Sequence, residues 1–244
     1  MHRRTFMIAA AVGPLALAAA GRGSSQASPA PGSGDVPAAP PRPVLEVPVI
    51  GRAAWGALAA RRGLRRHRPV RLTLHHSGVR LTEDASAPGM VRQHQRWHML
   101  EKGHPDIDYH FLVDRRGNVY EGRDPSFRGD TQTDYDPTGH LLVCCEGDYE
   151  GSAGAPQRPT PVMLRAVAAV FAAASQRWDI DPATLGGHRE YTSMTSCPGR
   201  SLQRLMRDGS VESQIERLVA QQDVRLMTLD GRAGRRTVRR IERS

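Results

Sequence analysis

Two segments far apart in the chain contain residue types that could bind one metal ion together. His75 and His76 end the apolar stretch RLTLHH, and His188 and Cys197 lie far downstream in GHREYTSMTSCPG. Two imidazole nitrogens and one thiolate are a natural ligand set for zinc, with one of its four coordination positions left open. Three protein ligands are typical of a catalytic zinc ion, whereas a structural site takes four.

The segment Val70–His76 predicts a buried strand, and this limits how the two adjacent histidines can act. Neighbouring side chains of a strand point to opposite faces, so Leu74 and His76 share one face while His75 takes the other. Two adjacent strand residues rarely bind the same ion. We therefore expect one of these histidines to be a metal ligand and the other to pack.

The remaining elements are predicted from periodicity and from turn and capping residues. Thr160 is a helix-capping residue followed by Pro161 at the first helical position. His94 and His98 lie four residues apart on a predicted helix but lack the glutamate of a helical zinc motif, so we interpret them as structural. Strands that alternate with helices indicate an α/β sheet. The other predicted elements are a helix at Met90–Glu101, a hairpin of Tyr109–Val113 and Val119–Tyr120, a buried strand at Leu141–Cys145 and a last helix at Val211–Val219.

The first 20 residues are typical of an export signal. A basic start, an apolar run and the small residues Ala18-Ala19-Ala20 form a secretory pattern, and the run is too short to span a bilayer. The sequence Arg3-Arg4-Thr5-Phe6-Met7 resembles a twin-arginine signal, which directs export of folded proteins; an ordinary secretory signal is the alternative. Residues 21–48 are rich in Ala, Pro, Gly and Ser and predict a linker before a domain at 49–220.

The C-terminal segment 221–244 is a basic tail that contains seven arginines, and we expect it to be a solvated, disordered end. The whole chain carries a net charge of +9, which would suit anionic wall polymers, membrane surfaces or nucleic acid. No nucleic-acid motif is present, so we expect no nucleic-acid partner. Cys144 and Cys145 are adjacent and should point to opposite faces of a strand as buried, unbridged residues.

The sequence resembles the zinc-dependent N-acetylmuramoyl-L-alanine amidases, the family of phage amidase-type lysozymes and peptidoglycan recognition proteins. The resemblance runs from residue 52 to about residue 205, and its blocks occur in the family's order. It implies an α/β fold, a single domain with a central mixed β-sheet flanked by helices and a zinc ion at the foot of a groove. It also implies a hydrolase of cell-wall peptidoglycan. We expect it to be a secreted monomer without a membrane span. The blocks are RAAWGA, LTLHHSG, VRQHQRWHM, DIDYHFLVDRRGNVYEGR and GHREYTSMTSCPG.

By position, the resemblance implies that His75, His188 and Cys197 hold the zinc ion. Tyr109 matches the family's catalytic tyrosine, and Thr195 matches a position that holds lysine or threonine in active members. Their hydroxyls would donate to the carbonyl oxygen of the amide between N-acetylmuramic acid and L-alanine, and one such donor is worth roughly 3 kcal/mol. The interval from His188 to Cys197 (197 − 188 = 9) is one residue longer than usual. The extra residue either displaces Thr195 or bulges outwards.

Other positions depart from the family's pattern. Asp108 stands where the family prefers glycine, and Cys144 stands where a related subgroup has a glutamate base, which leaves Glu146 as a weak substitute. The segment after Arg123 lacks the Gly-Trp pair that animal members use for diaminopimelate-type stem peptides, so no stem preference is implied.

Two other functions compete with the amidase. One is a non-catalytic peptidoglycan-binding protein, but such relatives usually lose the metal-binding cysteine, and Cys197 is present. The other is a zinc peptidase that cuts within the stem peptide, which the same ligand set would suit. The family blocks favour the amidase.

Overall fold

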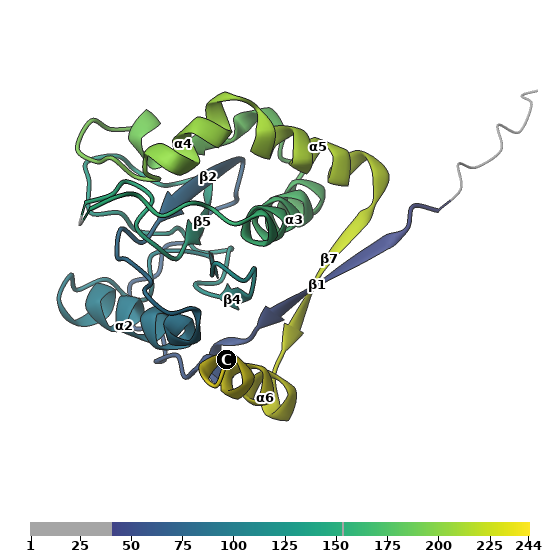
Figure 1. Ribbon diagram of the computed structural model, residues 1–244. Helices are drawn as coiled ribbons and strands as arrows, with labels where there is room; N and C mark the ends of the chain where they lie inside the picture. The colour runs from purple at the N-terminus through teal and green to yellow at the C-terminus, as the bar shows by residue number, and fades with distance from the viewer. Residues whose placement is uncertain (1–40, 153) are drawn as a thin grey trace, which may run out of the picture. The chain divides into compact units, whose positions relative to one another are not determined.

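A seven-stranded mixed sheet forms the centre of the computed structural model, which describes residues 41–152 and 154–244 (Figure 1). The strands run in the order β6-β2-β5-β3-β4-β1-β7, and β3 with β4 is the antiparallel pair. The expected α/β domain with a central mixed sheet is therefore confirmed, whereas the predicted signal lies outside the described residues. The strands are β1 (Val44–Ile50), β2 (Arg71–His76), β3 (Phe111–Val113), β4 (Val119–Glu121), β5 (His140–Cys145), β6 (Gly186–Gly187) and β7 (Asp223–Leu229).

Helices cover both faces of the sheet, and each face has its own apolar core (Figure 1). One core packs α3, α4 and α5 on the sheet; the other packs α1, α2 and α6 on the opposite face. Within the described residues, no helix has the length and apolar composition needed to cross a membrane. The α-helices are α1 (Arg52–Trp55), α2 (Ala87–Leu100), α3 (Pro161–Trp178), α4 (Arg200–Arg207), α5 (Ser210–Gln221) and α6 (Gly231–Glu242). Single 3₁₀ turns are η1 (Asp84–Ser86), η2 (Pro182–Thr184) and η3 (His188–Glu190).

The central strands β2 and β5 are parallel and in register, with His75 opposite Cys144. Cys144 belongs to the core on the α2 side and Cys145 to the core on the α3 side, and both thiols are free. The predicted alternation of these two cysteines is therefore confirmed. Leu74 packs in the α3-side core, so the same alternation turns His75 towards the α2 side.

The helix signals read from the sequence are correct in kind but not in every boundary. The Thr160 side chain accepts a hydrogen bond from Met163 N at 3.2 Å, which confirms it as the N-cap of α3. Helix α2 begins at Ala87, three residues earlier than predicted. Pro88 lies in its first turn, where a missing N–H costs nothing, so the helix includes the three residues before its predicted start.

The expectation of a solvated C-terminal end is wrong for residues 223–242. Strand β7 pairs with β1 along all seven residues, and α6 buries Gly234, Val238 and Ile241 against the α2-side core. Residues 44–48, expected in the linker, belong to β1. The backbone groups of β1 need a partner strand, and β7 supplies it.

Because Ile241 is 4 % exposed, α6 should contribute to the stability of the whole unit. We expect Ile241→Ala to lower the free energy of unfolding by about 2–4 kcal/mol, measured by urea denaturation. The exposed neighbour Arg243→Ala is the control, with a change within about 0.5 kcal/mol. Equal, small effects of both substitutions would show that α6 does not share the core.

Candidate functional site

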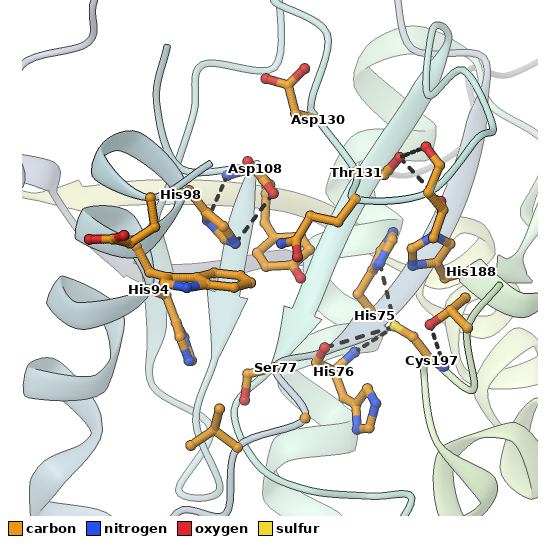
Figure 2. Close-up of a pocket in the computed structure, with 18 of the residues that line it drawn as sticks. His75, His76, Ser77, His94, His98, Asp108, Asp130, Thr131, His188 and Cys197 are labelled. Carbon is orange, nitrogen blue, oxygen red and sulfur yellow. Dashed lines mark hydrogen bonds and ion pairs between the residues drawn. The ribbon is translucent and has the colours of Figure 1, made fainter. Parts of the chain in front are cut away.

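Three buried side chains from separate parts of the chain converge at the carboxyl end of β2 (Figure 2). His75 is the penultimate residue of β2, His188 begins η3, and Cys197 lies in the loop before α4. One nitrogen or sulfur atom of each lies within 4.8 Å of the others, and Cys197 Sγ is 3.5 Å from His75 Nδ1. The structure thus brings together the three residues that were predicted as metal ligands.

The electrostatics of this group suit a bound cation. Burial lowers the pKa of His75 well below its ordinary value and lowers the pKa of His188 to about 4, so both imidazoles are neutral and keep a lone pair. Burial raises the pKa of Cys197 to about 12, although His76 N donates to its sulfur at 3.3 Å. A thiolate here needs a nearby positive charge, and two imidazoles with one thiolate are ligands that zinc prefers.

The loop between His188 and Cys197 turns one side chain outwards and keeps another in the pocket. Arg189 N donates to Cys197 O at 2.8 Å, which closes the loop at its base. Met194 is 64 % exposed, whereas Thr195 lines the pocket and its Oγ1 accepts a hydrogen bond from Cys197 N at 3.1 Å. Of the two predicted outcomes, the outward bulge agrees with this arrangement.

The second histidine of the pair takes a different place. The ring of His76 lies beside that of Tyr149, with 6.3 Å between centroids, and its Nδ1 accepts a hydrogen bond from Tyr149 N at 3.1 Å. In Figure 2 the His76 ring points away from His75. His76 is therefore engaged in packing on the opposite side of the strand.

Tyr109 lies directly beside the three converging side chains. Its ring centroid is 5.2 Å from that of His75, and it lines the same pocket. Burial raises the pKa of Tyr109 well above its usual range, so the hydroxyl stays protonated and can donate a hydrogen bond. Its carbonyl oxygen accepts from Arg123 N at 2.8 Å, and a Cβ on Gly122 would lie 2.2 Å from that oxygen. Only glycine allows this close backbone approach.

Two residues near His188 were missed in the sequence. Thr133 Oγ1 lies 2.8 Å from His188 Nε2, and the Tyr135 ring is 5.1 Å from the His188 ring. The hydroxyl holds one nitrogen of His188 and leaves Nδ1 free, which is how histidines at metal sites are commonly oriented. Thr133 is 55 residues away from His188, so no local pattern could have revealed the contact.

Asp108, the residue at the family's glycine position, is nearly completely buried and joins two histidines. Its Oδ1 is 2.7 Å from His104 Nδ1 and its Oδ2 is 3.3 Å from His98 Nε2. Asp130 lies close enough to His104 and Asp108 to suggest a second metal group. However, Asp130 already pairs with Arg123 at 2.7 Å, so we interpret these residues as a charge network in the pocket wall.

Glu146, the weak alternative base, is fully buried and lies 3.1 Å from His94 Nδ1. It does not line the pocket, so it has no direct access to a substrate. Burial lowers the pKa of His94, but the adjacent carboxylate outweighs this effect and the pKa is raised overall. His94 and His98 thus pair with different carboxylates, as the structural interpretation of this helix pair requires.

The pocket above the three converging side chains has a volume of about 770 Å³. Its walls come from α2, the end of β2, residues 130–133 and residues 194–197. Val79, Trp97 and Met194 are partly exposed apolar side chains at its wall, and Tyr109 and Thr195 add hydroxyls. A cavity of this size and mixed character fits a ligand with both apolar and polar groups.

Comparison with known proteins identifies the family. The sequence model of the N-acetylmuramoyl-L-alanine amidases matches residues 65–200. The chain belongs to this family. The matched range contains His75, Tyr109, His188, Thr195 and Cys197.

The similar proteins are peptidoglycan recognition proteins. Protein SD of Drosophila simulans is 30 % identical over 165 residues, which cover 66 % of this chain and 85 % of that protein. Recognition protein 1 of Bos indicus is 29 % identical over 164 residues, covering 65 % and 82 %. The crystal structure of Drosophila protein SD superposes with a TM-score of 0.59 at 27 % identity, covering 66 % of this chain and 94 % of that one. A human relative, PGRP-IBETAC in complex with glycosamyl muramyl pentapeptide, has a TM-score of 0.54 at 25 % identity, covering 66 % and 93 %.

The His94–Glu146 pair predicts a pH-dependent contribution to stability. Because the pKa of His94 is raised by folding, the pair stabilises fully below the unfolded value of 6.5 and loses this effect as pH rises through the folded value. Glu146→Gln should lower the free energy of unfolding by about 3 kcal/mol near pH 6 and by clearly less near pH 9, measured by denaturant titration.

The exposed Glu216→Gln serves as the control and should show no such pH dependence. A cost of Glu146→Gln that is the same at both pH values would exclude a charged His94–Glu146 pair.

Proposed function

We propose that the protein is an exported, zinc-dependent N-acetylmuramoyl-L-alanine amidase that acts on peptidoglycan. The observation that supports this most strongly is the convergence of His75, His188 and Cys197 at the foot of a pocket beside Tyr109. Family membership supports the reaction, and the human relative in complex with a muramyl peptide supports the substrate class. Export is proposed because the N-terminal sequence predicts a signal, and action as a monomer is proposed with it.

In this proposal His75, His188 and Cys197 would hold the zinc ion. Zinc, when bound, supplies Lewis-acid chemistry that activates water and polarises a carbonyl group. The hydroxyl of Thr133 keeps the His188 ring in place, and the hydrogen bond from His76 N to Cys197 Sγ favours the thiolate. These contacts fix the donor atoms before any ligand arrives, which keeps the cost of reorganisation low.

Tyr109 and Thr195 would stabilise the charge that develops during hydrolysis. Water adds to the lactyl carbonyl carbon, the carbon–nitrogen bond breaks, and the alanine nitrogen leaves with a proton. The carbonyl oxygen becomes negatively charged on the way, so a protonated Tyr109 hydroxyl nearby lowers the barrier. The Thr195 oxygen already accepts from Cys197 N, which leaves its O–H to donate into the pocket.

The metal proposal predicts about one zinc ion per chain, checked by metal analysis of the purified protein. Cys197→Ala should reduce the zinc content strongly, because it removes the one anionic ligand of the group. His76→Ala should keep the zinc, because the His76 ring packs with Tyr149 on the other side of the strand. Full zinc occupancy of Cys197→Ala would remove Cys197 from the proposed ligands.

The catalytic role of Tyr109 is tested by Tyr109→Phe, which removes one donor and keeps the aromatic ring. Zinc content and stability should be retained while kcat falls by about 10²- to 10³-fold. Activity is measured by digesting purified cell walls and identifying the new termini by mass spectrometry. Near-normal activity of zinc-loaded Tyr109→Phe would falsify this role.

The same digestion separates the amidase from the two other functions. Free L-alanine amino termini with intact sugars support the amidase, whereas cuts within the stem support a peptidase. The matched relatives carry the name of recognition proteins, which makes a binding protein without activity the specific alternative. Zinc-loaded protein that binds walls and releases no termini would establish that alternative.

A further inference from the structure

The segment beyond the family match carries a dense run of positive charge. The match ends at residue 200, so β7 and α6 lie outside it. Helix α6 and its C-cap residue carry six exposed arginines, and none of their guanidinium groups has a carboxylate partner within ion-pair distance among the described residues. They are Arg232, Arg235, Arg236, Arg239, Arg240 and Arg243.

These six arginines of α6 and its C-cap, hereafter the arginine row, lie on one side of the helix. At 100° per residue they fall within an arc of about 140°, opposite the buried Gly234, Val238 and Ile241. From Arg232 to Arg243 the row extends about 16 Å along the axis at 1.5 Å per residue. The exposed side of α6 therefore presents a line of unpaired positive charge.

The arginine row is held in place by the fold. Strand β7 pairs with β1 over seven residues, and α6 packs against α1 and α2. Arg92 of α2 also binds Glu242 at 2.7 Å, which neutralises the one carboxylate within α6. Helix α2 forms a wall of the pocket. Because α6 packs against α2, the arginine row lies on a helix next to the wall of the proposed active site.

We propose that the arginine row of α6 binds a linear, flexible polyanion with phosphate groups at regular intervals, of the phosphodiester-linked polyol type attached to cell walls. Arginine suits phosphate because its planar group donates two parallel hydrogen bonds and stays charged at every relevant pH. A row of such groups along one helix matches repeated phosphates better than a single anion. This surface lies outside the pocket and goes beyond the proposed amidase activity.

The structure disfavours a lipid surface as the partner. A helix that lies in a membrane interface buries an apolar face in the lipid. In α6 the apolar residues Val238 and Ile241 already pack in the protein core, and the outward side consists mainly of arginines. The exposed side of α6 can therefore attract a partner only through the charge of its arginines. A polyanion can bind along the arginine row without any apolar contact.

The test compares two full-length variants that lose the same charge on opposite sides of the sheet. The first replaces Arg235, Arg236, Arg239 and Arg240 of α6 by glutamine. The control replaces four exposed arginines on α3, α4 and α5 by glutamine. These are Arg165, Arg204, Arg207 and Arg217.

Binding is measured with purified poly(glycerol phosphate) and by co-sedimentation with cell walls that keep or lack their phosphate polymer. We expect the α6 variant to lose affinity for the polymer and for intact walls by at least about tenfold. Its affinity should also depend less steeply on salt, because binding through fewer phosphate contacts releases fewer counterions. The control variant should bind nearly normally. Both variants should keep their zinc content and their activity on soluble muramyl peptides.

Each other outcome overturns the proposal. Equal losses in the two variants would show that net charge alone governs binding. An α6 variant that binds the polymer normally but loses binding to anionic vesicles or DNA would assign the row to another partner. A loss on walls that lack the polymer would assign it to peptidoglycan. Because binding is measured apart from cleavage, failure of the amidase proposal would leave these results interpretable.

Discussion

The burial of β2 and β5 between two layers of helices is the constraint on which the site depends. Every side chain of β5 is buried, and β2 pairs with it residue by residue. Alternate residues must therefore enter different cores, which sends Leu74 to one face and His75 to the other. The same burial keeps water from His75 and Cys197, so imidazole and thiol are neutral until a cation arrives. The burial of β2 and β5 therefore determines both how the sheet packs and how the metal-binding side chains are charged.

The sequence was sufficient wherever a residue's role follows from its immediate neighbours or from the order of the family's blocks. Thr160 caps α3 because a capping residue, a proline and an apolar stripe follow one another locally. The apolar run before His75 predicts a buried strand, and alternation predicts the separation of Cys144 from Cys145. The meeting of His75 with His188 and Cys197 could be foreseen because the family's order implies it.

Contacts between polar residues that are far apart in the chain, and that the family's pattern does not relate, could not be foreseen. Glu146 and His94 are 52 residues apart, and the residues next to each of them in sequence do not predict that they pair. Helix α6 was not predicted for another reason. Arginines dominate its composition, and its few apolar residues become buried only when β7 pairs with β1. A strand at the edge of a sheet is hard to predict from local sequence when the strand that pairs with it lies far away in the chain.

The pairing of β1 with β7 has a consequence for the order in which the protein can fold. Residues 44–48 of β1 have β7 as their partner strand, and the partners are 179 residues apart (223 − 44 = 179). Contacts so distant in sequence are closed late, because the intervening chain must first be ordered. A ribosome must therefore synthesise the intervening residues and β7 before this edge of the sheet can close. Among the described residues, β7 thus closes an edge of the sheet whose other strand, β1, leaves the ribosome far earlier.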